Sequence, residues 1–348
     1  VEEFVGEVMR RDDRAIGELT HSQQQIWIGQ QLHPRSPLYN MAFAFLVPEE
    51  IDVEAFDGAW GRIAAASDAL RTRFRARDGR TVRVGSARAP ATERLDLSPH
   101  PDPAAAFLDW CAERSSRPLD PARSLVDSVL VRLGDRGTGW YLNQHHLIAD
   151  AWSTQLLYRS VAEAYRAIRE GRAGEIPPLP AFYPAAASLP SGEAERTAAR
   201  EHWRARRRRP GRKVELYGRR AAPEGTASRR RTLRLDRARS ERLDALAGEP
   251  GFRSLSLDVS RFALFATLLT GWLHRISGAG EVGFDAPVTG RPTTEAKRAL
   301  GLVIEMFPVA AEIEPDDTFR TRGARCLDEA HRFLARALPR LSSPSGAD

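Results

Sequence analysis

Hydrophobic and polar positions change their period repeatedly along the first half of the chain, and each period predicts a helix or a strand. Asp52 is a candidate cap for a helix with one apolar face, and Thr20 with Gln23 has the spacing of a capping box. The predicted elements are a helix at 19–32, a strand at 41–47, the helix after Asp52, a strand at 70–74, a helix at 104–114 and paired strands at 124–133 and 139–145. Helices and strands that alternate in this way predict an α/β sandwich.

A stretch rich in proline, alanine and serine separates this half from a second run of predicted elements. It contains the rigid, extended piece Ile176–Pro180, so we expect the chain to divide there. The second half predicts a strand at 232–236, a helix at 240–247, a helix at 257–276 capped by Ser256 or Asp258, strands at 281–288 and 307–313 and a helix at 318–338. The expected domains are a leader at 1–18, an N-terminal lobe at 19–176, a linker at 177–200 and a C-terminal lobe at 201–348.

The stretch Asn143–Ser153 lies where a predicted strand gives way to a predicted helix. Ser153 can cap this helix, whose apolar positions recur at helical spacing until Gly171 ends it. Two adjacent histidines and Asp150 therefore lie at a strand end, where α/β proteins commonly build their sites.

The adjacent residues His145 and His146 are not expected to share one task, because neighbouring strand residues point to opposite faces. We expect one to face the packed interior and the other a cavity, where a neutral imidazole suits proton transfer near pH 7. The same geometry argues against a zinc site, and no Cys or Glu at ligand spacing completes a set. Asp150 is placed to bind a cation and fix the loop. Two purely structural histidines are the alternative.

Composition narrows the class of protein. The chain has 348 residues, of which 42% are hydrophobic, enough for a large core with more than one lobe. The longest apolar run, 262–273, is too short to cross a membrane and predicts a buried helix. Residues 1–14 are charged and carry no signal peptide, and Cys111 and Cys326 are too few for a disulfide framework. We expect a cytoplasmic protein without a membrane partner.

The net charge of +6 comes mainly from arginine, with a basic run at 204–209. That run ends at Pro210–Gly211, and no aromatic residues are interleaved with it on a recognisable nucleic-acid module. Nucleic acid is therefore not an expected partner. The run is expected to be a solvated surface or, alternatively, to attract an acidic partner.

Four segments, in chain order, resemble the motifs of one family. His145–Ala151 resembles the His-His-x-x-x-Asp-Gly motif of condensation domains from nonribosomal peptide synthetases. Leu19–Trp27 is similar to that family's opening motif, and Ser67–Phe74 to its second motif, which ends in Leu-Arg-Thr-x-Phe. Val288–Pro292 and Gly301–Val309 resemble the Gly-Arg segment and the later Gly-Phe-Phe-Val-Asn-Thr motif.

The resemblance implies a fold as well as a class. Members have two chloramphenicol acetyltransferase-like α/β sandwich lobes in one chain, which form a V-shaped pseudo-dimer around a cleft. No sequence repeat is visible here, so the twofold arrangement comes from the family alone. Family members usually run about 100 residues further, so the C-terminal lobe is expected to be incomplete.

The implied reaction transfers an acyl chain from the 4′-phosphopantetheine thioester of an acyl or peptidyl carrier protein to an amine or hydroxyl. His146, the second motif histidine, is assigned to accept a proton from the nucleophile or to orient it, and His145 supports it. The acceptor is carrier-bound or free, and the product is an amide or an ester. The chain has no cofactor or metal of its own and is expected to be a monomer.

The remaining assignments are structural. Asp150 is expected to hold the loop with Arg71 or Arg291 as its cation, and the sequence does not choose between them. Trp152 is assigned to structural support. A heterocyclising relative would carry aspartates at the histidine positions, so that activity is excluded. An esterifying acyltransferase of a small alcohol and a non-catalytic carrier-docking domain remain alternatives.

Two departures from the family pattern bear on the acceptor. The usual motif glycine is Ala151, which would be tolerated if its backbone dihedrals are ordinary. The usual Asn-Thr pair is Glu305–Met306, and Glu305 is expected to face solvent or, alternatively, to adjust the acceptor side of a cleft. These departures make an alcohol acceptor plausible.

Overall fold

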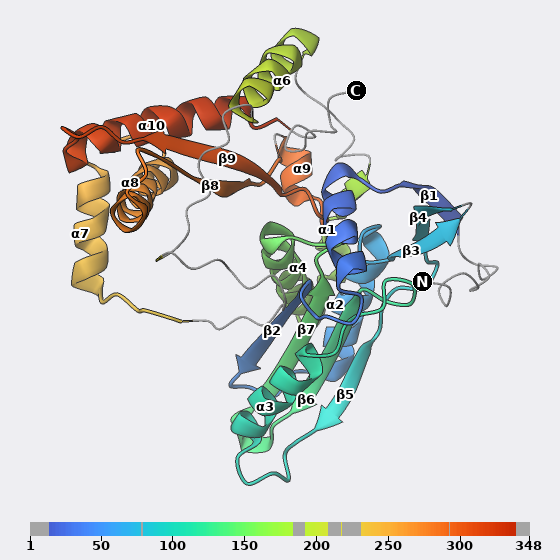
Figure 1. Cartoon of the computed structure of the whole chain (residues 1–348). Helices are drawn as coiled ribbons and strands as arrows, with labels where there is room; N and C mark the ends of the chain where they lie inside the picture. Colours follow the sequence, from blue (N-terminus) through green and yellow to red (C-terminus); the bar gives the residue numbers. More distant parts are fainter. Residues whose placement is uncertain are drawn as a thin grey trace. The chain divides into compact units, whose positions relative to one another are not determined.

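The computed structural model describes residues 14–77, 79–183, 192–207, 217, 231–291 and 293–338 (Figure 1). The chain forms two compact units. Unit 1 comprises Val1–Pro190 together with Arg291–Ile304, and unit 2 comprises Ser191–Gly290 together with Glu305–Asp348. The chain therefore enters unit 2, returns to unit 1 for a short segment and then enters unit 2 again.

The predicted leader at 1–18 differs from these units, because residues 14–18 form a strand that pairs within unit 1. Two further predicted domain limits also differ. Residues 291–304 were assigned to the C-terminal lobe but belong with unit 1, where the Arg291 side chain makes its hydrogen bonds. The predicted linker 177–200 contains the beginning of helix α6 (Glu193–Arg207), whose residue Trp203 packs in the core of unit 2. Both differences depend on contacts between segments that are distant in sequence.

The main sheet of unit 1 has the strand order β2-β7-β6-β5. Its strands are β2 (Asn40–Val47), β7 (Thr138–His145), β6 (Val126–Arg132) and β5 (Thr92–Asp96). The β5–β6 pair is parallel, whereas β7 is antiparallel to both β2 and β6. All residues of β7 are buried, as expected for a central strand covered on both faces. The predicted β6–β7 hairpin is confirmed.

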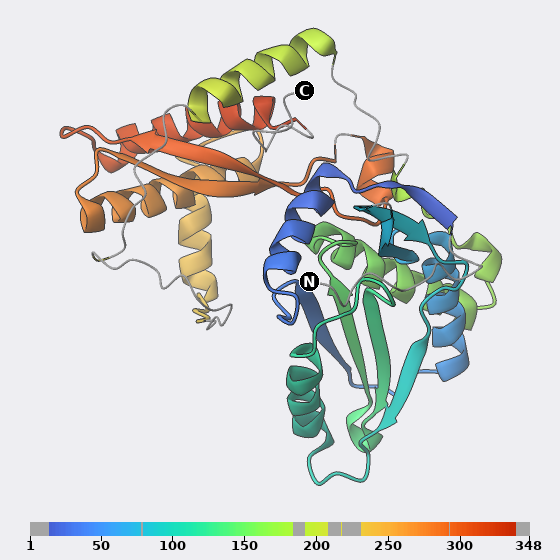
Figure 2. The same ribbon diagram turned by 45° about the vertical axis from the view of Figure 1, so that its right-hand side comes forward.

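Helices lie on both faces of this sheet (Figure 2). Alternate side chains of β7 pack against them on opposite faces, as the strand period of two requires. Trp140 of β7 belongs to the core formed with α2 (Val53–Ala66) and α4 (Ala151–Arg169). Its neighbour Tyr141 belongs to the core formed with α3 (Pro103–Ser115). The sandwich predicted for the first half is therefore present, and β7 runs through its centre.

A second sheet in unit 1 has the order β1-β4-β3, with β1 (Arg14–Glu18), β4 (Arg80–Gly85) and β3 (Thr72–Arg77). Helix α1 (His21–Leu32) follows β1 and begins with the predicted capping box. Short elements complete the unit: 3-10 turns at Gly134–Arg136 and Ala173–Glu175, and helix α9 at Thr294–Arg298.

Unit 2 contains an antiparallel pair of strands, β8 (Glu281–Val288) and β9 (Glu305–Glu312). Its other helices are α7 (Arg237–Ala247), α8 (Leu257–Ser277) and α10 (Phe319–Arg336). One core cluster brings α6, both strands and α10 together through Trp203, Ala286, Phe307, Val309 and Phe333. The predicted helices and the two later strands of this half are confirmed.

The strand predicted at 232–236 is wrong. These residues form neither helix nor strand, and Leu233 is 84% exposed. The alternating pattern suggested a strand, but a strand needs a neighbour to bind its backbone groups. The two-stranded sheet of unit 2 contains only β8 and β9 among the described residues, so no such neighbour is available.

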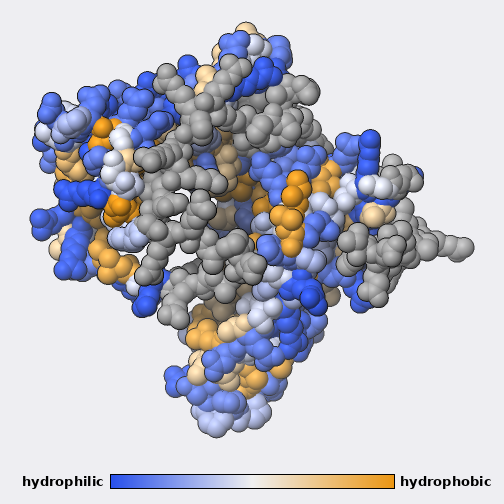
Figure 3. Space-filling model, in the orientation of Figure 1, coloured by the Kyte–Doolittle hydropathy of each residue, from blue (hydrophilic) through white to orange (hydrophobic). Residues whose placement is uncertain are grey.

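The described surface drawn in Figure 3 is mainly hydrophilic, with hydrophobic residues in separate areas. Ile28 and Leu32 are among the exposed hydrophobic residues, on the outer side of α1. Within the described ranges, no helix combines the length and the apolar character needed to cross a bilayer.

Candidate active site

Strand β7 ends in a turn that carries both motif histidines. The backbone N–H of His145 donates to Leu125 O at 2.9 Å, and the N–H of His146 donates to Tyr39 O at 2.8 Å. The N–H of Ile148 closes the turn on His145 O at 3.0 Å. Leu147 and Ile148 then bury their side chains in the main core of unit 1. Hydrogen bonds and two apolar anchors therefore fix the turn.

His145 is held at both ring nitrogens. Its Nδ1 accepts from the Leu147 N–H at 3.1 Å, so Nε2 carries the proton and donates to Gln30 Oε1 at 3.0 Å. Burial lowers the pKa of His145 to about 3, and the nearby charge of His146 lowers it as well. A neutral ring with both nitrogens engaged fits the supporting role assigned to His145 and leaves no atom for proton transfer.

His146 is half-buried and engages only one ring nitrogen in the described structure. Its Nδ1 lies 2.8 Å from Ala149 O, and because a carbonyl only accepts, Nδ1 must carry the proton. The lone pair is then on Nε2, which bonds to no group among the described residues. One ring nitrogen of His146 is therefore bonded to the backbone, and the other can accept a hydrogen bond or a proton.

Asp150 is the N-cap of α4, and its carboxylate joins three parts of unit 1. Oδ1 accepts from the Ser153 N–H at 2.8 Å, and Oδ2 accepts from the Val303 N–H at 3.1 Å. Arg291 Nη2 lies 3.2 Å from Oδ2. The prediction that Ser153 caps the helix is wrong, because the helix begins two residues earlier, at Ala151. Asp150 therefore binds a cation, as expected, and also caps the helix.

Arg291 is the cation that binds Asp150. The sequence had left the choice between Arg71 and Arg291 open. Arg291 is 5% exposed, and its Nη1 donates to Ala296 O at 2.7 Å and to Ala299 O at 2.6 Å. Its Nη2 donates to Gly301 O at 2.8 Å as well as to Asp150. One guanidinium thus ties segment 291–304 to the start of α4. Removing either charge would leave the other buried and uncompensated.

The other two residues assigned to support do not bind Asp150 through their side chains. Arg71 does not bind Asp150, because its Nη1 donates to Ser86 O at 3.3 Å. Trp152 is 41% exposed, and its indole N–H donates to Lys297 O at 2.8 Å. Trp152 therefore adds a second link between α4 and segment 291–304.

Ser153 and Gly301 are site residues that sequence reasoning did not identify. Ser153 Oγ donates to Gly301 O at 2.6 Å and accepts from Gly301 N–H at 2.9 Å. A Cβ on Gly301 would lie 2.1 Å from the Phe182 ring, so only glycine fits there. The resemblance included Gly301 in a motif, but nothing in the sequence paired it with Ser153.

Gln23 connects the capping box of α1 to the histidine turn. Its side chain is fully buried, and Nε2 donates to Leu147 O at 3.0 Å and to Tyr183 Oη at 3.3 Å. The Tyr183 hydroxyl donates to Thr72 Oγ1 at 2.9 Å. The opening motif, the second motif and the histidine motif therefore meet through one buried amide.

The two departures from the family pattern have different outcomes. Ala151 is an exposed first residue of α4, and its φ is not positive, so a glycine is not required there. The expectation that Glu305 faces solvent is wrong, because it is 4% exposed at the start of β9. Glu305 is the first residue of unit 2 after segment 291–304.

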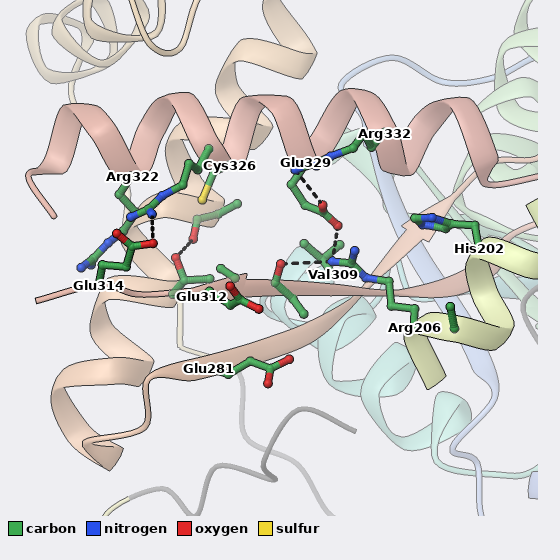
Figure 4. A pocket seen from close by; sticks show the side chains of 16 residues that line it. His202, Arg206, Glu281, Val309, Glu312, Glu314, Arg322, Cys326, Glu329 and Arg332 are labelled. Carbon is green, nitrogen blue, oxygen red and sulfur yellow. Dashed lines mark hydrogen bonds and ion pairs between the residues drawn. The ribbon is translucent and has the colours of Figure 1, made fainter. Parts of the chain in front are cut away.

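A charged cavity of about 530 Å³ lies within unit 2 and contains none of the predicted site residues (Figure 4). Arg206 reaches from α6 toward Glu329 on α10, forms an ion pair with it and also donates to Ala310 O at 3.2 Å. Burial raises the pKa of Glu329, and Arg206 opposes that shift. The arginines and glutamates that line the cavity neutralise one another, so it offers no evident acid–base pair like that at His146. No cluster of three or more potential metal ligands occurs among the described residues.

The chain belongs to the condensation-domain family, whose profile, described as "Condensation domain", matches residues 14–337. It is 28% identical over 336 residues to the phosphinothricin tripeptide synthetase PhsC of Streptomyces viridochromogenes, covering 94% of this chain and 30% of that protein. It is 29% identical over 327 residues to the isonitrile lipopeptide synthase of Streptomyces coeruleorubidus, covering 91% of this chain and 21% of that protein. The chain thus spans less than a third of the length of these relatives.

Solved structures agree with the family. The first condensation domain of the CDA synthetase aligns with a TM-score of 0.77 and 26% identity, over 92% of this chain and 75% of that one. A starter condensation domain of rhizomide synthetase RzmA aligns with a TM-score of 0.80 and 22% identity, over 95% and 76% of the two chains, and supports the fold alone. The mixed α/β fold predicted from sequence is therefore that of condensation domains.

Proposed function

We propose that this chain forms an amide bond by transferring an acyl group from a carrier-protein thioester to an amine held by a second carrier. The observation that carries the proposal is the orientation of His146. Its Nδ1 proton is bound by Ala149 O, so Nε2 presents a lone pair on a half-buried ring. A base fixed in this way suits removal of a proton from an attacking amine.

The amine nitrogen attacks the thioester carbonyl carbon and forms the new carbon–nitrogen bond. His146 Nε2 accepts the proton that the nitrogen loses, and it then returns that proton to the departing sulfur as the carbon–sulfur bond breaks. The products are an amide and a free phosphopantetheine thiol. Because an amine is partly unprotonated near pH 7, positioning by the site can supply part of the rate.

The surrounding residues support this step by fixing the turn. Asp150, Arg291 and Ser153 hold the start of α4, and Gln23 holds the turn from the other side through Leu147 O. Their roles in catalysis are part of the proposal, as is the two-lobed chloramphenicol acetyltransferase-like arrangement. We also propose that the substrates arrive on the 4′-phosphopantetheine arms of acidic carrier proteins and that the chain acts as a monomer.

The proposal is tested by mixing the chain with an acyl-loaded donor carrier and an aminoacyl-loaded acceptor carrier, and by following the product by intact mass. The wild type should convert the acceptor. His146→Ala should reduce the rate about 10²–10⁴-fold, the usual contribution of a general base. His100→Ala, which changes an exposed histidine in a loop, is the matched control and should leave the rate unchanged.

An acceptor carrying a hydroxyl in place of the amine extends the same assay. A hydroxyl is a weaker nucleophile, so its conversion should depend more strongly on His146 than that of the amine. If His146→Ala converted both acceptors at the wild-type rate, the proposed acyl transfer at this residue would be wrong, and the carrier-docking alternative would be left.

A further inference from the structure

We propose that a small basic pocket of unit 1 binds the phosphate of the phosphopantetheine arm, an inference that rests on the proposed function. The pocket has a volume of about 100 Å³ and lies between the start of β3, the residues after β4 and the loop before β6. Four arginines line it, at positions 71, 73, 88 and 123, together with Ser86 and Ser124.

The charge of this pocket has one sign. No aspartate or glutamate is among the residues that line it. Arg123 has a surface partner in Asp120, at 3.5 Å, but both side chains are largely exposed, and such pairs contribute little. The cavity of unit 2 contrasts with this, because arginines and glutamates line it together. A concave site whose charged lining residues are all arginines attracts an anion.

Arg71 is the best-oriented cation of the pocket. The backbone N–H of Ser86 donates to Arg71 O at 2.8 Å, and Arg71 Nη1 donates back to Ser86 O at 3.3 Å. This reciprocal pair holds the guanidinium in place. Its Nε is buried without a hydrogen-bond partner in the described structure, so the guanidinium keeps unused donor capacity. An unpaired buried donor is costly, and an acceptor oxygen would relieve that cost.

The loop that carries Arg88 is also organised before any ligand binds. Ser86 Oγ accepts from the Arg88 N–H at 3.2 Å and donates to Arg88 O at 3.0 Å. Pro90 O accepts from the Trp60 indole N–H, which ties the loop to the core. The pocket therefore has a defined wall between Ser86 and Pro90, on which Arg88 is exposed to solvent.

The pocket is attached to the histidine turn. Leu125, which lines it, accepts the backbone N–H of His145 at 2.9 Å. Thr72, which also lines it, accepts from Tyr183, and Tyr183 is bonded to Gln23 and through it to the turn. An anion bound in the pocket would therefore be held by the same framework that positions His146.

Size and chemistry favour a phosphate. About 100 Å³ accommodates one tetrahedral oxyanion with its waters and is too small for a nucleotide. Arginine binds phosphate oxygens through paired N–H groups, which gives both affinity and orientation. A phosphopantetheine arm carries one phosphate, at its carrier end. The acyl chain and the pantetheine carry no phosphate.

The test compares two donors that differ only in this phosphate: an acyl-pantetheine thioester and the corresponding acyl-4′-phosphopantetheine thioester. For the wild type we expect the phosphorylated donor to have a KM about 10-fold lower, with similar kcat, as expected for a group that adds about 1.4 kcal/mol of binding. Arg88→Gln and Arg71→Gln should each remove most of that difference by raising the KM of the phosphorylated donor only. Arg136→Gln, an exposed arginine in the β6–β7 turn, should change neither donor.

The outcomes separate this proposal from the function on which it rests. Failure of the wild type to transfer from either donor would contradict the proposed function. Transfer with no preference for the phosphorylated donor, or equal effects of Arg88→Gln on both donors, would overturn the phosphate pocket alone. Because Arg71→Gln can disturb the fold, the exposed Arg88 variant is decisive.

Added inorganic phosphate distinguishes a pocket that binds the phosphate of the arm from a pocket that binds free phosphate. If the pocket holds the arm, added phosphate should inhibit turnover of the phosphorylated donor competitively and leave the pantetheine donor unchanged. Equal effects on both donors at constant ionic strength would instead indicate a site for free phosphate, and the proposal would be wrong.

Discussion

Each unit of the molecule contains an arginine–carboxylate pair shielded from solvent, but the two pairs have different surroundings. Asp150 and Arg291 in unit 1 are 2% and 1% exposed at their side chains, and backbone groups and Ser153 engage them as well. Glu329 and Arg206 in unit 2 are 11% and 22% exposed and border a cavity. The first pair joins two distant chain segments beside the histidine turn, whereas the second lines an opening.

A buried ion pair can therefore have two different consequences. Such a pair adds little net stability over a well-packed apolar pair, but the loss of one partner is severe. In unit 1 the pair fixes the direction of α4 and the position of segment 291–304, and therefore the turn before α4. In unit 2 burial raises the pKa of Glu329, so the carboxylate is less firmly ionised.

Asp150→Ala should have the largest effect on stability. It removes a helix cap and leaves Arg291 buried without its counter-charge, so we expect a loss of about 3–5 kcal/mol in the free energy of unfolding. Urea unfolding of the whole chain, followed by tryptophan fluorescence, measures the loss. A soluble Asp150→Ala variant with an unchanged unfolding midpoint would contradict the anchoring role.

His145 should make stability depend on acid. The unfolded state binds a proton near pH 6.5, but in the folded state burial lowers the pKa of His145 to about 3. Its stabilising effect is therefore complete above pH 6.5 and decreases as the pH falls from 6.5 toward 3. His145→Gln should flatten the curve of unfolding free energy against pH by a few kcal/mol across this window.

His202 of unit 2 provides the comparison. Burial, with help from Arg336, Arg206 and Arg332, lowers its pKa to about 4. His202 is only partly buried, so His202→Gln should flatten the same curve less than His145→Gln. Equal effects of the two variants would show that the turn is no more tightly packed than the cavity.

Gln23→Leu should have an intermediate effect. It leaves Leu147 O and the Tyr183 hydroxyl without their shared amide and breaks one half of the capping box, so we expect a loss of about 1–3 kcal/mol. Gln23 holds the carbonyl of Leu147, the residue directly after His146, so its loss should displace the His146 ring. We therefore expect kcat to fall while KM changes little. Gln25→Leu, at an exposed position of the same helix, is the control for helix propensity. Similar kinetics for both variants would exclude a positioning role for Gln23.

Glu329→Gln should have the smallest effect. The amide keeps the shape of the side chain, and the partly exposed pair with Arg206 is screened by water, so we expect about 1 kcal/mol or less at pH 7. Urea unfolding under the same conditions as for Asp150→Ala gives the ratio of the two effects. A loss as large as that of Asp150→Ala would remove the distinction between the two regions.

Local chemistry was predictable from the sequence, and long-range partners were not. The caps at Thr20 and Asp52 and the β6–β7 hairpin follow from short-range spacing, and the structure confirms them. The choice of Arg291 over Arg71 as the partner of Asp150 depends on segment 291–304 returning to unit 1, which no local pattern encodes. The burial of Glu305 likewise depends on its surroundings in the fold.

Two predictions, the Ser153 cap and the strand at 232–236, were wrong for a more specific reason. Ser153 has the chemistry of a cap, but Asp150 lies three residues earlier and reaches the same N–H, so Ser153 Oγ is left for Gly301. Residues 232–236 have the alternation of a strand but no strand beside them among the described residues. In both cases the local signal was real, and a competing or missing partner decided the structure.

The account depends on the two neighbouring histidines holding opposite tautomers, and nitrogen-15 NMR of the histidine-labelled protein near pH 7.5 measures this directly. We predict that His146 carries its proton on Nδ1 and His145 carries its proton on Nε2, with His146→Ala and His145→Gln assigning the signals. If His146 instead carried its proton on Nε2, the nitrogen proposed to accept the substrate proton would already be occupied, and the account would be contradicted.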